Sequence, residues 1–204
     1  MSTSPFYFLA GIVTGPPVWL VFRLRASGKE NIPREGGFVL SANHLSNLDP
    51  WALGFPLFPR RQIRFMAKSE LFRWPLAPII KGAGAFRVRR GQGDAEAIAT
   101  AVQLARDGEV VAIFPEGTRR AKGLVKKHEA RPHTGAVRIA LGAEVPLIPA
   151  AITGTDRLSR LGPLRVAYGR AVDLDDLRDR DAREAAEIGT ERLMAAITEL
   201  GREL

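Results

Sequence analysis

Short apolar runs alternate with helix-patterned segments along most of this 204-residue chain. Apolar runs of about four to eight residues bounded by turn residues are typical of buried strands, whereas apolar residues three and four positions apart indicate helices. This alternation favours a single α/β domain with a mostly parallel or mixed central sheet flanked by helices. We expect strands within residues 36–44, 61–68, 84–90, 109–117, 145–152 and 164–169, and helices from Pro50, within residues 93–108 and 134–143, and at the C-terminal end, where Ile188, Leu193, Ile197 and Leu200 form one stripe.

Residues 6–22 form an apolar N-terminal segment without a charged side chain. As a helix it would reach roughly 26 Å, which is marginal for a hydrocarbon core about 30 Å thick. Pro16 and Pro17 also interrupt it, since a proline pair removes hydrogen-bond donors and kinks a helix. Its aromatic residues suit a membrane-interface segment, and a helix packed on the domain's own core is the alternative. We divide the chain into this interface segment, residues 1–28, and a folded domain, residues 29–204.

The charge balance and the missing cysteines narrow the functional classes. Thirty Lys and Arg oppose 22 Asp and Glu, and a formal charge of +8 indicates an anionic partner, such as nucleic acid, anionic lipid, a phosphorylated substrate or an acidic carrier protein. No cysteine is present, which excludes disulfides and thiolate catalysis and fits a reducing compartment. We find no zinc-finger spacing and no Gly-x-Ser-x-Gly elbow, which argues against nucleic-acid binding and against a serine hydrolase. The chain has three histidines in all, which argues against a metalloenzyme.

A histidine and an aspartate stand five residues apart where the first buried strand ends, in the sequence NHLSNLD at residues 43–49. Histidine is suited to remove a proton from a hydroxyl nucleophile because its ordinary pKa is near neutrality. A carboxylate across a tight turn can keep one ring nitrogen protonated and leave the other free as the base. His44 and Asp49 are therefore candidate catalytic residues. The alternative is a loop histidine beside an Asp49 that caps the helix beginning at Pro50.

Two further strand ends carry groups suited to an anionic substrate. The sequence FPEGTRR, residues 114–120, combines glycine, a hydroxyl and two arginines, which together can cradle an anion. The sequence GAFRVRRG, residues 84–91, places three cations near the end of another strand, and either strand face could line a phosphate site. A polar turn and a solvated basic edge strand are the respective alternatives.

Taken together, these segments resemble the glycerolipid acyltransferases, most nearly those of the 1-acylglycerol-3-phosphate (lysophosphatidic acid) type. The resemblance rests on NHLSNLD and FPEGTR in register, with GAFRVRRG between them and VPLIPAAITG, residues 145–154, as a fourth block. It covers residues 31–154, so residues 29–204 are expected to form an acyltransferase domain. It implies phospholipid synthesis: transfer of a fatty acyl group to the free hydroxyl of 1-acylglycerol 3-phosphate, which gives phosphatidic acid.

The resemblance also implies roles for individual residues. His44 would be the general base and Asp49 its partner. The acceptor would be bound by Arg87, Arg89, Arg90, Glu116, Gly117, Thr118 and Arg119, with Arg90 as the best match to the phosphate-binding arginine. The donor would be acyl-CoA or an acylated carrier protein, with no metal and no organic cofactor. We expect the protein on the cytoplasmic face of a membrane, in contact with anionic lipid and not with nucleic acid.

This sequence departs from the family pattern in ways that leave the acceptor open. His133 stands where many members have a lysine, and Arg89 stands where an acidic residue is common. Glycerol 3-phosphate, another lysophospholipid or a glycolipid are alternative acceptors for the same chemistry. A catalytically silent lipid-binding relative is the alternative from a different functional class.

Overall fold

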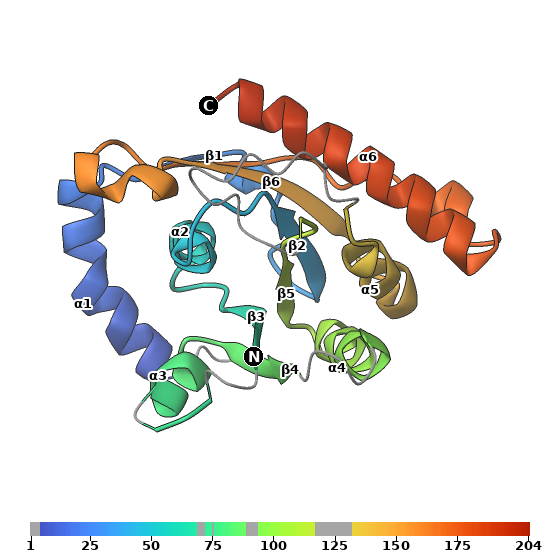
Figure 1. Cartoon of the computed structure of the whole chain (residues 1–204), viewed down its shortest axis with the longest axis horizontal. Coiled ribbons are helices and arrows are strands. Elements are labelled where there is room, and N and C mark those ends of the chain that lie inside the picture. Colours follow the sequence, from blue (N-terminus) through green and yellow to red (C-terminus); the bar gives the residue numbers. More distant parts are fainter. Residues whose placement is uncertain (1–4, 69–71, 75, 89–93, 117–131) are drawn as a thin grey trace, which may run out of the picture.

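The computed structural model describes residues 5–68, 72–74, 76–88, 94–116 and 132–204 (Figure 1). The helices are α1 (Pro5–Val21), α2 (Asp49–Gly54), α3 (Leu76–Gly82), α4 (Asp94–Arg106), α5 (Gly135–Ala143) and α6 (Ala182–Arg202). The strands are β1 (Arg25–Ser27), β2 (Phe38–Ala42), β3 (Ile63–Lys68), β4 (Ala85–Val88), β5 (Val110–Ile113), β6 (Leu147–Thr153) and β7 (Arg165–Tyr168). Short 3-10 helices at Lys29–Asn31, Phe55–Leu57, Thr155–Arg160 and Asp175–Leu177 join them.

The seven strands form one mixed sheet in the order β1-β7-β6-β2-β5-β3-β4. The strands from β6 to β4 are parallel to one another, and β7 runs antiparallel to β6. This confirms the predicted single α/β domain and specifies a mixed sheet. Strand β1 pairs with β7, so the sheet takes in residues 25–27, which the sequence analysis assigned to the N-terminal segment.

Successive residues of the central strands face opposite sides of the sheet, as the strand period of two requires. Phe38 and Leu40 pack on the side of α2, whereas Val39 packs on the side of α4, α5 and α6. Figure 1 shows the resulting three layers, with α1, α2 and α3 on one side of the sheet and α4, α5 and α6 on the other. Both sides of β2 are buried, which accounts for its mostly apolar sequence.

Helix α1 is continuous through Pro16 and Pro17, whereas the sequence predicted an interruption there. Tertiary contacts hold the helix on both sides of the proline pair. Gly11 lies against the Phe58 ring and Gly15 against the Phe55 ring, and the Trp19 ring lies 6.3 Å from that of Phe55. No helix in the described part of the chain is long and apolar enough to cross a membrane.

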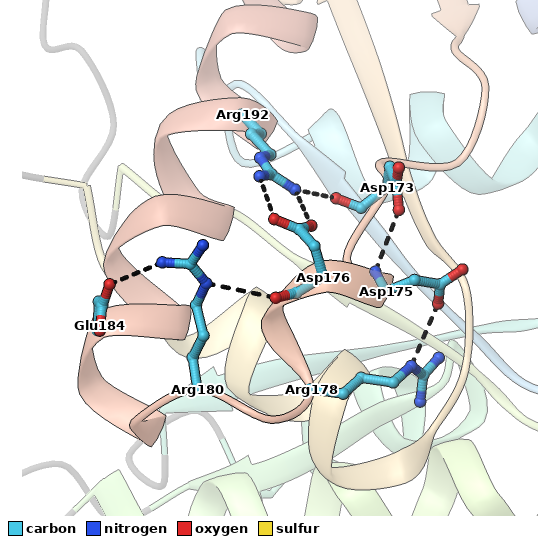
Figure 2. A network of polar contacts seen from close by, with 7 residues as sticks. All are labelled: Asp173, Asp175, Asp176, Arg178, Arg180, Glu184 and Arg192. Carbon is cyan, nitrogen blue, oxygen red and sulfur yellow. Dashed lines mark hydrogen bonds and ion pairs between the residues drawn. The ribbon is translucent and has the colours of Figure 1, made fainter.

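The connection between β7 and α6 is tied by a network of exposed charges (Figure 2). The guanidinium of Arg192 donates to both carboxylate oxygens of Asp176, at 2.6 and 2.8 Å, and to the Asp173 carbonyl at 2.8 Å. The hydrogen bonds that the Asp176 carboxylate accepts from Arg192 lower the pKa of Asp176 below its ordinary value. Helix α6 begins after Asp181, whose side chain accepts from the backbone N–H groups of Arg183 and Glu184.

Candidate active site

The carboxyl ends of the parallel strands bring two of the predicted site residues, His44 and Glu116, to one edge of the sheet. His44 follows β2, and Phe114 and Glu116 follow β5, which is the neighbour of β2. In open α/β sheets this edge is where ligands usually bind. In the strand order β2-β5-β3-β4, strand β3 lies between β5 and β4.

His44 and Asp49 are in direct contact, as the sequence predicted. The two atoms His44 Nδ1 and Asp49 Oδ2 are 2.8 Å apart. Asp49 is fully buried, and the side chain of His44 is 17% exposed. Because an ionised carboxylate only accepts hydrogen bonds, Nδ1 carries the proton, and Nε2 is left with the free lone pair that a general base needs.

Asp49 does not cap helix α2, and the predicted alternative of a helix cap is wrong. It is the first residue of that helix, and its side chain turns back toward the preceding loop. Oδ2 accepts from the backbone N–H groups of Leu45, at 2.6 Å, and Ser46, at 2.7 Å. The tight loop between His44 and Asp49 is thus closed by the same oxygen that contacts the imidazole.

Three residues that sequence reasoning gave no separate role complete the surroundings of this pair. The Phe114 ring stacks on the imidazole of His44, with centroids 4.3 Å apart. Asn43 exchanges two hydrogen bonds with the backbone of Ile152, at 2.8 and 3.0 Å, which ties the end of β2 to β6. The Thr155 hydroxyl donates to Asp49 Oδ1 at 2.5 Å. Asn43 and Phe114 lie inside the recognised blocks, but no local pattern marks Thr155, whose partner is 106 residues away.

The predicted acceptor-binding residues are only partly described. Arg87 lies in β4 beside Ala67 of β3, and Glu116 lies half-buried at the end of β5. The residues outside the described part of the chain are Arg89, Arg90, Gly117, Thr118 and Arg119. The backbone N–H of His133 donates to the Pro115 carbonyl at 2.8 Å, so the chain returns to the end of β5 after residues 117–131.

A second group of arginines lies at the opposite edge of the sheet, around a cavity of about 400 Å³. Arg61 donates to the carbonyls of Arg34, Gly36 and Gly108 and lies over the Phe38 ring. Its burial lowers the pKa of its guanidinium. Arg61 ties together the segments that precede β2 and follow α4, so these contacts give it a structural role away from His44.

Comparison with known proteins decides the family. Residues 23–153 match the family described as Acyltransferase. The chain belongs to this family. Over 186 residues it is 33% identical to the 1-acyl-sn-glycerol-3-phosphate acyltransferase of Bacillus subtilis, covering 89% of each chain. It is 27% identical to the protein of the same name from Borreliella burgdorferi, over 68% of this chain and 55% of that one.

The fold of this acyltransferase also matches a solved structure. The crystal structure of the 1-acyl-sn-glycerophosphate (LPA) acyltransferase from Thermotoga maritima superimposes with a TM-score of 0.68 at 24% identity. The match covers 95% of this chain and 76% of that one. The family membership predicted from the sequence is confirmed, and the chain is an O-acyltransferase.

Proposed function

We propose that this acyltransferase moves a fatty acyl group from an acyl thioester to the free hydroxyl of 1-acylglycerol 3-phosphate, giving phosphatidic acid. The observation that carries the proposal is the contact between His44 and the buried Asp49 at the carboxyl end of β2. A hydrogen-bonded base at a strand end of an acyltransferase suits the removal of a proton from an acceptor hydroxyl. The names of the bacterial relatives support 1-acylglycerol 3-phosphate as that acceptor.

In this reaction His44 Nε2 takes the hydroxyl proton while the hydroxyl oxygen attacks the thioester carbonyl carbon. The C–O bond forms, the C–S bond breaks, and the proton passes from the imidazolium to the departing thiolate. Asp49 stabilises the imidazolium between these two transfers. General-base catalysis of this kind contributes roughly 10²–10⁴-fold, and holding the hydroxyl beside the thioester contributes further.

We further propose that the acceptor is bound by Arg87, Arg89, Arg90, Glu116, Gly117, Thr118 and Arg119. Arginine forks suit a phosphate group, and both segments follow or end strands at the edge that carries His44. Arg90→Ala is expected to raise KM for the acceptor more than KM for the donor.

We also propose that the protein works at a membrane surface, on the cytoplasmic face. One side of α1 faces the domain, and its other side is exposed at Leu9, Ile12, Val13 and Leu20, by 61, 52, 64 and 79%. Trp74, 88% exposed, and Ile79 on α3 are further exposed apolar residues, and Arg73 and Lys81, which are near them in the sequence, are also exposed. Apolar and aromatic side chains bordered by cations suit an interface with anionic lipid.

The membrane proposal is tested by sedimentation with phosphatidylglycerol vesicles and with phosphatidylcholine vesicles. The double variant Leu9→Ser, Val13→Ser should lose binding, whereas the double variant Glu191→Ser, Glu199→Ser on exposed positions of α6 should keep it. Equal binding by the two double variants would contradict the proposal. Wild-type binding should be stronger to the anionic vesicles.

The acyl-transfer proposal is tested on the full chain in detergent micelles, with phosphatidic acid detected by mass spectrometry. Palmitoyl-CoA and palmitoylated carrier protein serve as donors in separate reactions. The acceptors are 1-acylglycerol 3-phosphate, glycerol 3-phosphate, a lysophosphatidylcholine and a glycolipid. We expect phosphatidic acid from wild type and none from His44→Ala, whose fold is checked by its melting temperature.

Two other outcomes of the acyl-transfer assay would lead to different conclusions. Product from a different acceptor alone would keep the chemistry and replace the acceptor. No transfer by folded wild type to any of the four acceptors would reject acyl transfer and favour a silent lipid-binding relative.

A further inference from the structure

The two carboxylate oxygens of Asp49 have different surroundings. Oδ2 accepts three hydrogen bonds, from His44 Nδ1, Leu45 N and Ser46 N, all from its own loop. Within the described part of the chain, the donor to Oδ1 is the hydroxyl of Thr155, at 2.5 Å. Oδ1 is therefore held by a residue from outside the loop.

Thr155 is brought to Asp49 by the turn that follows β6, the strand beside β2. The two hydrogen bonds between Asn43 and Ile152 align the ends of these strands. Gly154 then has a φ of +91°, and a Cβ at this residue would lie 2.6 Å from the Pro163 carbonyl oxygen, so the turn needs a glycine. Thr155 itself is 2% exposed, which shields its hydrogen bond from water.

We propose that Thr155 is a positioning residue for the general base, a role that rests on the proposed function. Its hydroxyl fixes the rotation of the Asp49 carboxylate, so that Oδ2 faces His44 and holds the proton on Nδ1. Nε2 then remains available and correctly aimed at the acceptor hydroxyl. A misplacement of about 1 Å near reacting groups can cost about 10²-fold in rate, so loss of this hydroxyl should appear in kcat.

The same hydrogen bond stabilises the negative charge of the carboxylate that faces the imidazole, because the hydroxyl donates to it. The pH profile of kcat is therefore a second readout of this contact. Other charged groups on the neighbouring segments of the described structure are Glu116 after β5 and the Asp156–Arg157 ion pair beyond Thr155, and the Thr155 variants keep all three residues.

The test compares Thr155→Val, Thr155→Ser and Thr155→Cys with a matched control, Thr190→Val, in the full chain. Thr190 is also buried, 5% exposed, but its hydroxyl donates to the Ala186 carbonyl within α6. Steady-state acyl transfer from palmitoyl-CoA to 1-acylglycerol 3-phosphate is measured from pH 5 to 9. The melting temperature of each variant is recorded.

We expect Thr155→Val to lower kcat by about 10–100-fold with KM for the donor within about twofold of wild type, and to change the pH profile of kcat. Thr155→Ser should restore most of kcat and the wild-type pH profile. Thr155→Cys, whose thiol is a weak donor, should have a kcat between those of the valine and serine variants. It replaces Thr155→Val in the test if the valine variant does not fold. Thr190→Val should behave like wild type.

Three results would overturn this role. If the wild-type enzyme is active and both Thr155→Val and Thr155→Cys have its kcat and its pH profile, the positioning role alone is rejected. Equal loss of kcat in Thr155→Ser and Thr190→Val would show general destabilisation instead. An inactive wild type would reject the proposed function and this role with it.

Discussion

The Phe114 ring lies stacked on the imidazole of His44, with 4.3 Å between centroids and 20° between planes. Phe114 follows β5 and His44 follows β2, so the stack joins two of the sequence blocks that carry the family resemblance, at neighbouring strand ends. Asp49 holds the imidazole at one ring nitrogen, and Phe114 covers one of its faces. The two contacts together leave the imidazole little freedom to rotate, which suits a base that must point in one direction.

Replacing Phe114 by leucine should slow catalysis without unfolding the protein. Leucine keeps much of the apolar contact but loses the stacked ring, and such ring pairs contribute about 0.5–1.5 kcal/mol. We expect kcat/KM to fall by about 2–10-fold in Phe114→Leu and to stay near wild type in Phe114→Tyr, which keeps the ring. Steady-state acyl-transfer assays check this, and equal activity in the leucine and tyrosine variants would contradict a role for stacking.

Substitutions of Asp49 should separate its charge from its structural contacts. Asp49→Asn keeps an acceptor oxygen for the loop N–H groups but removes the charge that stabilises the imidazolium, so kcat should fall by about 10²–10⁴-fold. Asp49→Ala leaves buried donors without an acceptor and should lower the free energy of unfolding by about 3–5 kcal/mol as well. Urea unfolding and acyl-transfer assays on the same preparations measure both effects. Near-wild-type activity in Asp49→Asn would remove Asp49 from the mechanism.

The local sequence patterns predicted most of the strands and the helices on the α4–α6 side. Each of these segments carries its own period of apolar residues, and β2, β5 and β6 carry continuous apolar runs because both their faces are buried. The contact between His44 and Asp49 was also predictable, since a spacing of five residues across a turn limits how far apart they can lie.

Features that depend on contacts between residues far apart in the sequence are not marked by any local sequence pattern. Strand β1 has three residues and pairs with β7, with Arg25 opposite Arg165, so no periodic pattern could mark it. Helix α1, continuous through Pro16 and Pro17, packs against the rings of Phe55 and Phe58, which lie more than thirty residues further along the chain. The contact of Thr155 with Asp49 follows from the β2–β6 pairing, which a sequence pattern does not specify.

Two glycine-to-alanine substitutions should change stability in opposite directions. A Cβ at Gly37 would lie 1.8 Å from the Ala105 carbonyl oxygen, whereas a Cβ at Gly201 in α6 has no atom within 4 Å. Gly37→Ala must displace the backbone at the end of α4 and should cost at least about 1–3 kcal/mol. Gly201→Ala should stabilise by up to about 0.5–1 kcal/mol. Thermal unfolding measures both, and equal melting temperatures would contradict the predicted clash.

The ion pair between Asp176 and Arg192 should contribute stability that depends on pH. The hydrogen bonds from Arg192 lower the pKa of Asp176 in the folded protein, so the contribution is fully present above the unfolded pKa, about 3.9. It is lost as the pH falls through the lowered folded value. Asp176→Asn should therefore unfold at lower urea than wild type at pH 7, and the difference should shrink below about pH 4. Because the pair is exposed, about 1 M NaCl should also reduce the difference at pH 7.

Glu199→Gln, which changes an exposed acid on α6, is the control. A stability difference between wild type and Asp176→Asn that stays constant from pH 7 to pH 3 would contradict the assignment.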